Sequence, residues 1–185
     1  RDTRHTTRQA RYTVSMRQAI LDLEASKIRE VANAGLGRTD VLAFWFGESD
    51  EVTPSFVRQA AIDSLQQGET FYAHNLGLPA LRAAIAHTMT QRHAAHEPAR
   101  AIDVPRVAVT SGGVNALMLA MQALLDAGDE VVAVTPVWPN LTAQPGILGA
   151  QVRTVSLRPR RGAWSLDLSE LLEAITPRTR LLVVN

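Results

Sequence analysis

The chain has 185 residues, of which 46% are hydrophobic and 20% charged, a composition that predicts packed structure and excludes intrinsic disorder. The formal charge is +1, and no apolar run approaches the about 20 residues that span a bilayer, so neither nucleic acid nor a membrane is expected as a partner. No cysteine is present, which excludes disulfides and thiol chemistry, and we expect a cytoplasmic protein.

The N-terminal region is predicted to form an arm followed by a helix. Residues 1–20 are rich in Arg and Thr; a transit peptide has this composition, but no cleavage signal supports one and a solvated arm is the simpler interpretation. Residues 15–34 have apolar side chains at helical spacing, and Gly35 follows as a stop signal. This helix carries Lys27, the only lysine, so amine chemistry must use Lys27 or a residue outside the chain.

A short strand and two helices are predicted next. Residues 41–46 form an apolar run of strand length. Thr53 and Pro54 are the expected N-cap and first residue of a helix that ends at Gly68. A further helix begins at Leu78-Pro79, and its buried stripe is expected to consist of Leu81, Ala84, Ile85 and Met89.

From residue 106 onward, apolar strands alternate with helices. Helices are predicted at 114–125 and 166–175, a short helix or turn at 140–148, and strands at 106–110, 130–135, 151–156 and 180–184. Continuous β-branched runs are typical of parallel strands buried on both faces and joined by right-handed crossovers. The sequence therefore predicts an α/β fold. A buried strand at 180–184 with nothing after it also predicts that the chain is a fragment of a longer protein.

A candidate anion site lies at residues 110–114, where a strand is predicted to end and a long helix to begin. Gly112 and Gly113 allow a close approach to the backbone, and the N–H groups of a helix N-terminus attract phosphate. A tight turn without a ligand explains the glycines equally well. The segment lacks the GxGxxG and GxxxxGK[ST] patterns, which disfavours an ordinary nucleotide-binding domain.

Trp138 follows the next strand, between two prolines. Ligands of open parallel sheets bind beyond the carboxyl ends of the strands, so the indole is a candidate wall for a flat aromatic ligand. Packing in the core is the alternative, and it is the commoner role for such a residue.

Two loops that precede helices supply further polar groups. Tyr72 and His74 lie where side chains reach a ligand or a partner subunit, although His74 has no paired carboxylate and is predicted to be solvated. Gly47 begins an acidic loop that a divalent ion or plain solvation explains. No metal site is predicted, because no firm ligand spacing is formed by His87, His93 and His96.

Taken in this order, the segments resemble the N-terminal half of the class I and II aminotransferases, the fold-type I enzymes that use pyridoxal 5′-phosphate. The resemblance covers residues 15–185, and its strength lies in the ordered combination of weak motifs. These motifs are the Gly47 loop ending in Thr53-Pro54, Tyr72 with Gly77 and Leu81-Arg82, Ser111-Gly112-Gly113, residues 124–131, and Pro136-Val137-Trp138-Pro139.

The resemblance implies a three-layer α/β sandwich with a mostly parallel central sheet, truncated here, and an N-terminal helical arm. Residues 1–45 would form the arm and part of a small domain. Residues 46–185 would form the first, incomplete part of the large domain that binds pyridoxal phosphate.

Roles for individual residues follow from the same resemblance. Trp138 would stack on the pyridine ring. Tyr72 would reach the phosphate of the neighbouring subunit's cofactor, which implies a homodimer with shared active sites. Gly47 would lie near the substrate carboxylate. The cofactor phosphate would be held by the backbone amides of Gly112, Gly113 and Val114.

The resemblance also places the catalytic groups outside this chain. In the family, the Schiff-base lysine, the acid at the pyridine nitrogen and the arginine at the substrate carboxylate come from the second half, beyond Asn185. Lys27 lies in the N-terminal helix and is rejected as that lysine, so the isolated chain is predicted to be inactive. The whole protein is expected to exchange an amino group between an amino acid and a 2-oxo acid. A C–S lyase, a decarboxylase or a cyclopropane-forming synthase of the same fold stay open, as does a non-catalytic effector-binding module.

Overall fold

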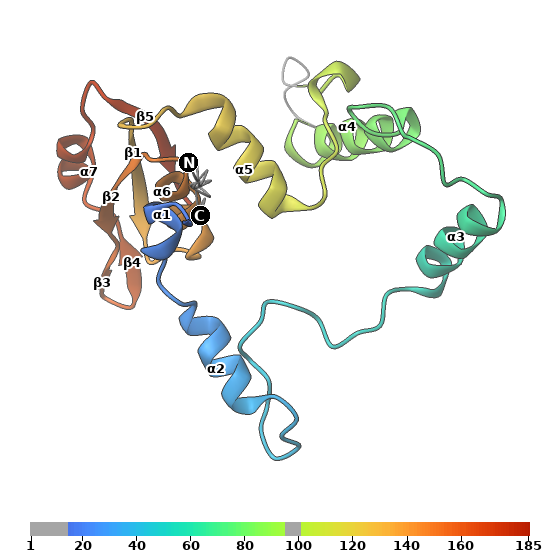
Figure 1. Ribbon diagram of the computed structural model, residues 1–185, viewed down its shortest axis with the longest axis horizontal. Helices are drawn as coiled ribbons and strands as arrows, with labels where there is room; N and C mark the ends of the chain where they lie inside the picture. Colours follow the sequence, from blue (N-terminus) through green and yellow to red (C-terminus); the bar gives the residue numbers. More distant parts are fainter. Residues whose placement is uncertain (1–14, 95–100) are drawn as a thin grey trace, which may run out of the picture. The chain divides into compact units, whose positions relative to one another are not determined.

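The computed structural model describes residues 15–94 and 101–185, which belong to two compact units (Figure 1). The sheet unit combines Arg1–Ala25 with Leu125–Asn185, and the helical unit is Ser26–Leu124. Most of the expected N-terminal arm, and His96, lie outside the described residues.

The sheet unit is built around three parallel strands in the order β2-β1-β5. The central strand is buried from Glu130 to Val134, with no exposed surface on Val131, Val132 or Ala133. Residue 131 of β1 lies opposite Val152 of β2 and Leu181 of β5. The elements of this unit are α1 (Gln18–Leu21), β1 (Glu130–Thr135), α6 (Asn140–Ile147), β2 (Gln151–Ser156), β3 (Arg158–Arg160), β4 (Ala163–Ser165), α7 (Leu168–Ala174) and β5 (Thr179–Val183).

The strand order gives this sheet a helix on each face. The chain moves from β1 through α6 to one neighbour, β2, and then returns past β1 through α7 to the other neighbour, β5. Because parallel crossovers are right-handed, this reversal places α6 and α7 on opposite faces. Figure 1 shows the sheet between these helices, α6 in contact with β1 and β2 and α7 in contact with β2. The predicted α/β architecture with a mostly parallel sheet is confirmed.

Strand prediction succeeds in this unit except for one hairpin. The strands predicted at 130–135 and 151–156 match β1 and β2 residue for residue, and β5 is displaced by one residue. The missed hairpin pairs β3 with β4 in antiparallel fashion. Its loop residues, Arg161 and Gly162, have φ values of 50° and 80°. Turns of this type favour Asn-Gly or Asp-Gly, so Arg-Gly gives a weaker sequence signal.

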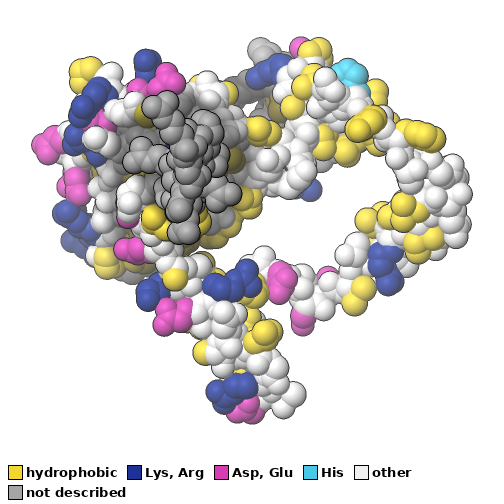
Figure 2. All heavy atoms as spheres, viewed as in Figure 1, with side chains coloured by type: hydrophobic (Ala, Val, Ile, Leu, Met, Phe, Trp, Pro, Cys, Tyr) yellow, Lys and Arg dark blue, Asp and Glu magenta, His cyan; other side chains and the backbone are white. Residues whose placement is uncertain are grey.

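The helical unit consists of helices joined by long loops. Figure 2 shows hydrophobic side chains gathered over α3 and α4, and α3 has no buried residue. Phe56 of α3 is 75% exposed. The elements of this unit are α2 (Lys27–Gly35), α3 (Ser55–Gln66), α4 (Pro79–His93), the 3₁₀ helix η2 (Val104–Arg106) and α5 (Gly113–Leu124).

Two predictions about helices need correction. The single helix predicted at 15–34 is wrong: α1 and α2 are separate helices, and the Ser26 side chain starts α2 by accepting a hydrogen bond from the Arg29 N–H at 3.3 Å. The helix predicted from Pro54 begins one residue later, with Pro54 in place of Thr53 at the N-cap. The helices predicted from Pro79 and at 114–125 are confirmed as α4 and α5.

The buried stripe predicted for α4 is also wrong. Arg82 and Ala86 are the buried residues of this helix, whereas Leu81 and Met89 are 44% and 38% exposed. The physical reason is that a buried arginine takes the inward position by bonding backbone carbonyls, as described below.

The strands predicted at 41–46 and 106–110 do not form. Residues 41–46 lie in a loop, and Phe44 is 85% exposed. Val107 has extended dihedral angles, but the segment from 107 to 110 has no strand partner among the described residues. An apolar run has the composition of a strand. A strand forms, however, only where a neighbouring strand accepts and donates its backbone hydrogen bonds.

Candidate functional site

A tight turn joins the extended segment at 107–110 to α5, and we call residues 110–114 the phosphate loop. The Gly112 N–H donates to the Thr110 carbonyl at 2.8 Å, and the Thr110 hydroxyl donates to the Gly112 carbonyl at 3.0 Å. Gly112 has φ +93°, a conformation that L side chains rarely adopt. The Ala116 N–H then donates to the Gly112 carbonyl at 3.1 Å, which starts the helical ladder of α5.

The phosphate loop fits an anion such as a phosphate monoester. A Cβ atom added at Gly112 or Gly113 would meet no atom within 4 Å, so a ligand can approach the backbone closely here. The 12-residue α5 has no acidic residue in its first turn. Its N-terminal dipole and amide groups therefore attract a negative charge without local repulsion.

The backbone leading into the phosphate loop is held by α4 and by the loop before it. The Val109 N–H donates to the Leu76 carbonyl at 2.9 Å. Gly77, with φ +99°, lies so close that an added Cβ would stand 2.6 Å from the Val109 side chain. Arg82 donates to the Val107 and Val104 carbonyls, each at 2.8 Å. The sequence analysis named Arg82 as part of a family motif but gave it no role in this site.

The remaining expected site residues of the helical unit lie in exposed loops. Tyr72 is fully exposed. His74 has a local role, because its Nδ1 accepts a hydrogen bond from the Leu76 N–H at 3.2 Å. Gly47 has open space around a would-be Cβ atom. Among the described residues, no hydrogen bond joins Tyr72 or Gly47 to the phosphate loop.

Trp138 belongs to the sheet unit and lies directly beyond the carboxyl end of β1. Its carbonyl accepts a hydrogen bond from the Leu141 N–H at 2.9 Å, so the residue is fixed against the start of α6. The side chain is 38% exposed, which argues against a purely packing role in the core. The chain adds β2 on one side of β1 and then β5 on the other side, and open α/β sheets bind ligands beyond the carboxyl ends of the strands where the strand order reverses in this way.

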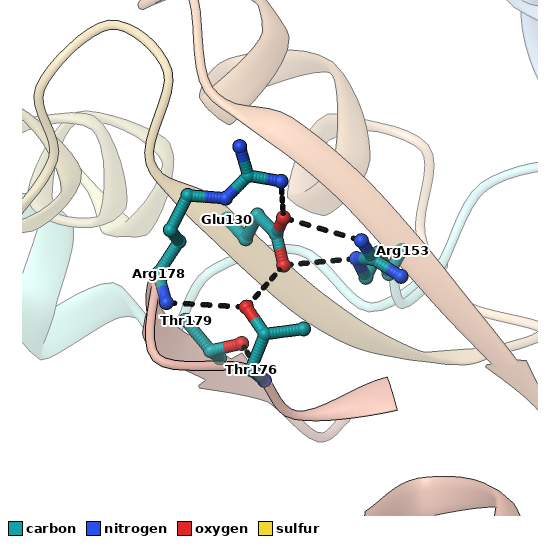
Figure 3. Close-up of polar contacts among 5 residues, drawn as sticks. All are labelled: Glu130, Arg153, Thr176, Arg178 and Thr179. Atoms are coloured by element: carbon teal, nitrogen blue, oxygen red, sulfur yellow. Dashed lines mark hydrogen bonds and ion pairs between the residues drawn. The ribbon is translucent and has the colours of Figure 1, made fainter. Parts of the chain in front are cut away.

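A buried carboxylate lies at the opposite, amino-terminal end of the strands (Figure 3). Glu130 has no exposed surface; it accepts hydrogen bonds from Arg153 Nε at 2.9 Å, from the Thr176 hydroxyl at 2.8 Å and from Arg178. The Thr176 hydroxyl and then Arg153 lower the pKa of Glu130 from 4.5 to about 2. These bonds join β1, β2 and the turn before β5, so the cluster is structural and remote from Trp138.

A shallow depression beside the β3–β4 hairpin has an explanation in local folding. Asp167 caps α7 by accepting hydrogen bonds from the Ser169 and Glu170 N–H groups, which lower its pKa. Arg158 pairs with Glu170 at 2.7 Å. None of the expected site residues lines this depression.

In residues 15–94 and 101–185, no group of three or more His, Asp or Glu side chains is placed to hold a metal ion. No helix in the same ranges combines the length and apolar character needed to cross a membrane.

Comparisons with known proteins identify relatives. The aspartate/prephenate aminotransferase of Thermus thermophilus is 38% identical over 146 residues, which are 79% of this chain and 36% of that protein. The arginine–pyruvate transaminase of Pseudomonas aeruginosa gives the same identity over the same shares. This chain thus spans well under half the length of the relatives it matches.

Solved structures of aminotransferases are also similar to this chain. A single mutant of Thermus thermophilus aspartate aminotransferase superposes with a TM-score of 0.80 and 31% identity, over 93% of this chain and 44% of the other. Residues 39–185 match the family model described as aminotransferase class I and II. The chain therefore belongs to the class I and II aminotransferases, the fold-type I family that depends on pyridoxal 5′-phosphate.

Proposed function

We propose that this chain is the N-terminal part of a cytoplasmic aminotransferase that transfers an amino group from an amino acid to a 2-oxo acid. The observation that carries the proposal is the family match over residues 39–185, which include both the phosphate loop and Trp138. The relatives named above act, by their names, on aspartate, prephenate, arginine and pyruvate, which supports an amino acid and a 2-oxo acid as the substrates.

In this proposal the chain binds and orients the cofactor. The backbone amides of Gly112, Gly113 and Val114 hold the phosphate, and the indole of Trp138 covers one face of the pyridine ring. The bound cofactor supplies an electron sink, and the protein supplies position and electrostatics. The open surface over the two glycines and the partly exposed indole support these roles.

A homodimer with shared sites completes the proposal. Tyr72 serves the cofactor of the partner subunit, and Gly47 lies near the substrate carboxylate. Full exposure of Tyr72 supports a role outside its own subunit, and the exposed apolar side chains of α3 support contact with further protein.

We further propose that the catalytic lysine lies outside this chain, which is inactive on its own. Lys27 is on α2, where its side chain is 84% exposed and pairs with Glu30 at 3.0 Å. Such a solvated ammonium has no pocket in which to act as a nucleophile or base. Residues 1–45 then belong to the arm and small domain, and residues 46–185 to the first part of the large domain.

To test the proposal, the full-length protein with bound pyridoxal phosphate is incubated with pairs of amino acids and 2-oxo acids. We expect a new amino acid to form in equal amount to the oxo acid released from the donor. Release of ammonia with an oxo acid would instead identify a lyase, and release of carbon dioxide a decarboxylase. Binding of the cofactor without any turnover would favour an effector-binding module. Each of these three results contradicts the proposal.

A further inference from the structure

Arg82 is a buried charged residue whose hydrogen bonds go to backbone carbonyls. Its side chain retains 9% exposure, Nε donates to the Val107 carbonyl, and a terminal amino group donates to the Val104 carbonyl. A buried guanidinium is costly unless its N–H groups are bonded. The side chain and the segment at 104–107 therefore hold each other in place.

Hydrogen bonds tie the segment at 102–110 to α4 and to the loop before it. Within the described residues it joins no sheet, and its backbone bond to another segment runs from the Val109 N–H to the Leu76 carbonyl. At its start, the Ile102 N–H donates to the hydroxyl of Thr90, also on α4, at 2.8 Å. Two side chains of α4, Arg82 and Thr90, thus bond the chain on its way to the phosphate loop.

We propose that Arg82 is a positioning residue for the cofactor phosphate, an inference that rests on the proposed function. By fixing the Val104 and Val107 carbonyls, Arg82 sets where the extended chain delivers Thr110 and the amides that follow it. Val107 and Thr110 are only three positions apart, a span of about 10 Å when extended, so a displacement of Val107 is passed on to the phosphate loop. The guanidinium itself bonds carbonyls and does not need to touch the phosphate.

The chemistry of this contact requires arginine. The planar guanidinium presents several donors in a fixed fork and serves two carbonyls at once, whereas a lysine ammonium is a point charge on a flexible stem. Arg82→Lys therefore keeps the charge but loses the clamp, and Arg82→Met removes both. Arg92, which is exposed on the same helix, provides the matched control variant Arg92→Met.

The test compares pyridoxal phosphate with pyridoxal, which lacks the phosphate, as ligands of the full-length protein. The dissociation constants for both are measured in the wild type and the three variants. We expect Arg82→Met and Arg82→Lys to weaken pyridoxal phosphate binding by about tenfold, the value of one charged hydrogen bond. Pyridoxal binding should stay within about twofold, because it makes no use of the phosphate loop. Arg92→Met should change neither constant.

The outcomes separate this inference from the proposed function. If the wild type binds both ligands equally well, the phosphate site of the proposed function is wrong. If the wild type prefers pyridoxal phosphate and the Arg82 variants keep the full preference, the positioning role is overturned. A general loss of stability would weaken both ligands together, which also overturns it. Should Arg82→Met fail to fold, Arg82→Lys tests the proposal through the same comparison, the ratio of its dissociation constants for pyridoxal and pyridoxal phosphate.

Discussion

At the scale of single residues, Glu130 combines full burial with a negative charge. Its carboxylate is stabilised by Arg153, Arg178 and the Thr176 hydroxyl, which come from separate segments of the sheet unit. A buried carboxylate with fewer partners would be neutralised or destabilising, because desolvation of a charge is expensive. The bonds to Glu130 therefore tie the amino ends of the strands together most strongly while the carboxylate is ionised.

The pH dependence of stability tests this role of Glu130. Its pKa is about 2 in the folded protein and 4.5 when unperturbed, so its contribution is present above pH 4.5 and is lost as the pH falls toward 2. We expect Glu130→Gln to lower the free energy of unfolding at pH 7. The difference from the wild type should shrink between pH 4.5 and 2. Denaturant unfolding of the full-length wild type and variant at a series of pH values measures this difference in the free energy of unfolding.

The control for Glu130→Gln is Glu173→Gln, at an exposed position on α7. This variant should follow the wild type at every pH, because a solvated carboxylate gains little from its neighbours. A gap between Glu130→Gln and the wild type that stayed constant from pH 7 to pH 2 would show that the carboxylate titrates normally.

At the scale of elements, the sequence predicted correctly the strands of the parallel sheet. It also predicted strands in two segments that have no partner strand among the described residues. β1 and β2 were predicted from short runs that contain β-branched residues, and the two strands pair with each other. The run at 41–46 is wholly apolar and the run at 106–110 is rich in valine, but neither has a partner strand among the described residues. Pairing depends on distant residues, so no local pattern distinguishes the two cases.

The candidate site shows the same division. The turn at Gly112 and the start of α5 were predicted from local chemistry, because glycine and a helix N-terminus leave a signal in sequence. The burial of Arg82 left no such signal. An arginine is normally placed in solvent, and only the positions of the Val104 and Val107 carbonyls explain why this one is buried.

A substitution at the start of α5 tests the anion site at this scale. Gly113 is not at positive φ and has open space around it, so Gly113→Leu should leave thermal stability unchanged. The new side chain would instead occupy the approach to the helix N-terminus. We expect the affinity for pyridoxal phosphate to fall by about tenfold, measured by cofactor titration of the full-length apoenzyme.

Gly146 of α6 supplies the control for Gly113. It too has no positive φ, and a Cβ atom added there would meet no atom within 4 Å. Gly146→Leu should retain normal cofactor affinity. Normal affinity in Gly113→Leu would reassign the glycine pair to a turn that binds no ligand.

At the scale of the whole molecule, the chain is expected to function as part of a dimer with shared sites. Tyr72 is fully exposed and makes no bond to its own phosphate loop among the described residues. If Tyr72 serves the partner's cofactor, the site of one subunit contains Tyr72 from the other and Gly113 from its own.

Mixed dimers test this arrangement. A dimer of one Tyr72→Phe chain and one Gly113→Leu chain places both lesions in a single site, so about half the high-affinity cofactor sites should survive. A dimer of one double-variant chain and one wild-type chain has a lesion in each site, and few should survive. Titration of differentially tagged, purified dimers with pyridoxal phosphate counts the sites. The reverse pattern would place Tyr72 in the site of its own subunit.

The two units are interleaved along the chain, and this order has a consequence for synthesis. The helical unit is one continuous segment, Ser26–Leu124, whereas the sheet unit starts before it and ends after it. During translation, β1 acquires β2 at one edge while its other edge waits for β5, which begins at Thr179. An apolar strand with an open edge is a site of aggregation. The nascent protein is therefore open to misassembly at β1 until β5 has emerged.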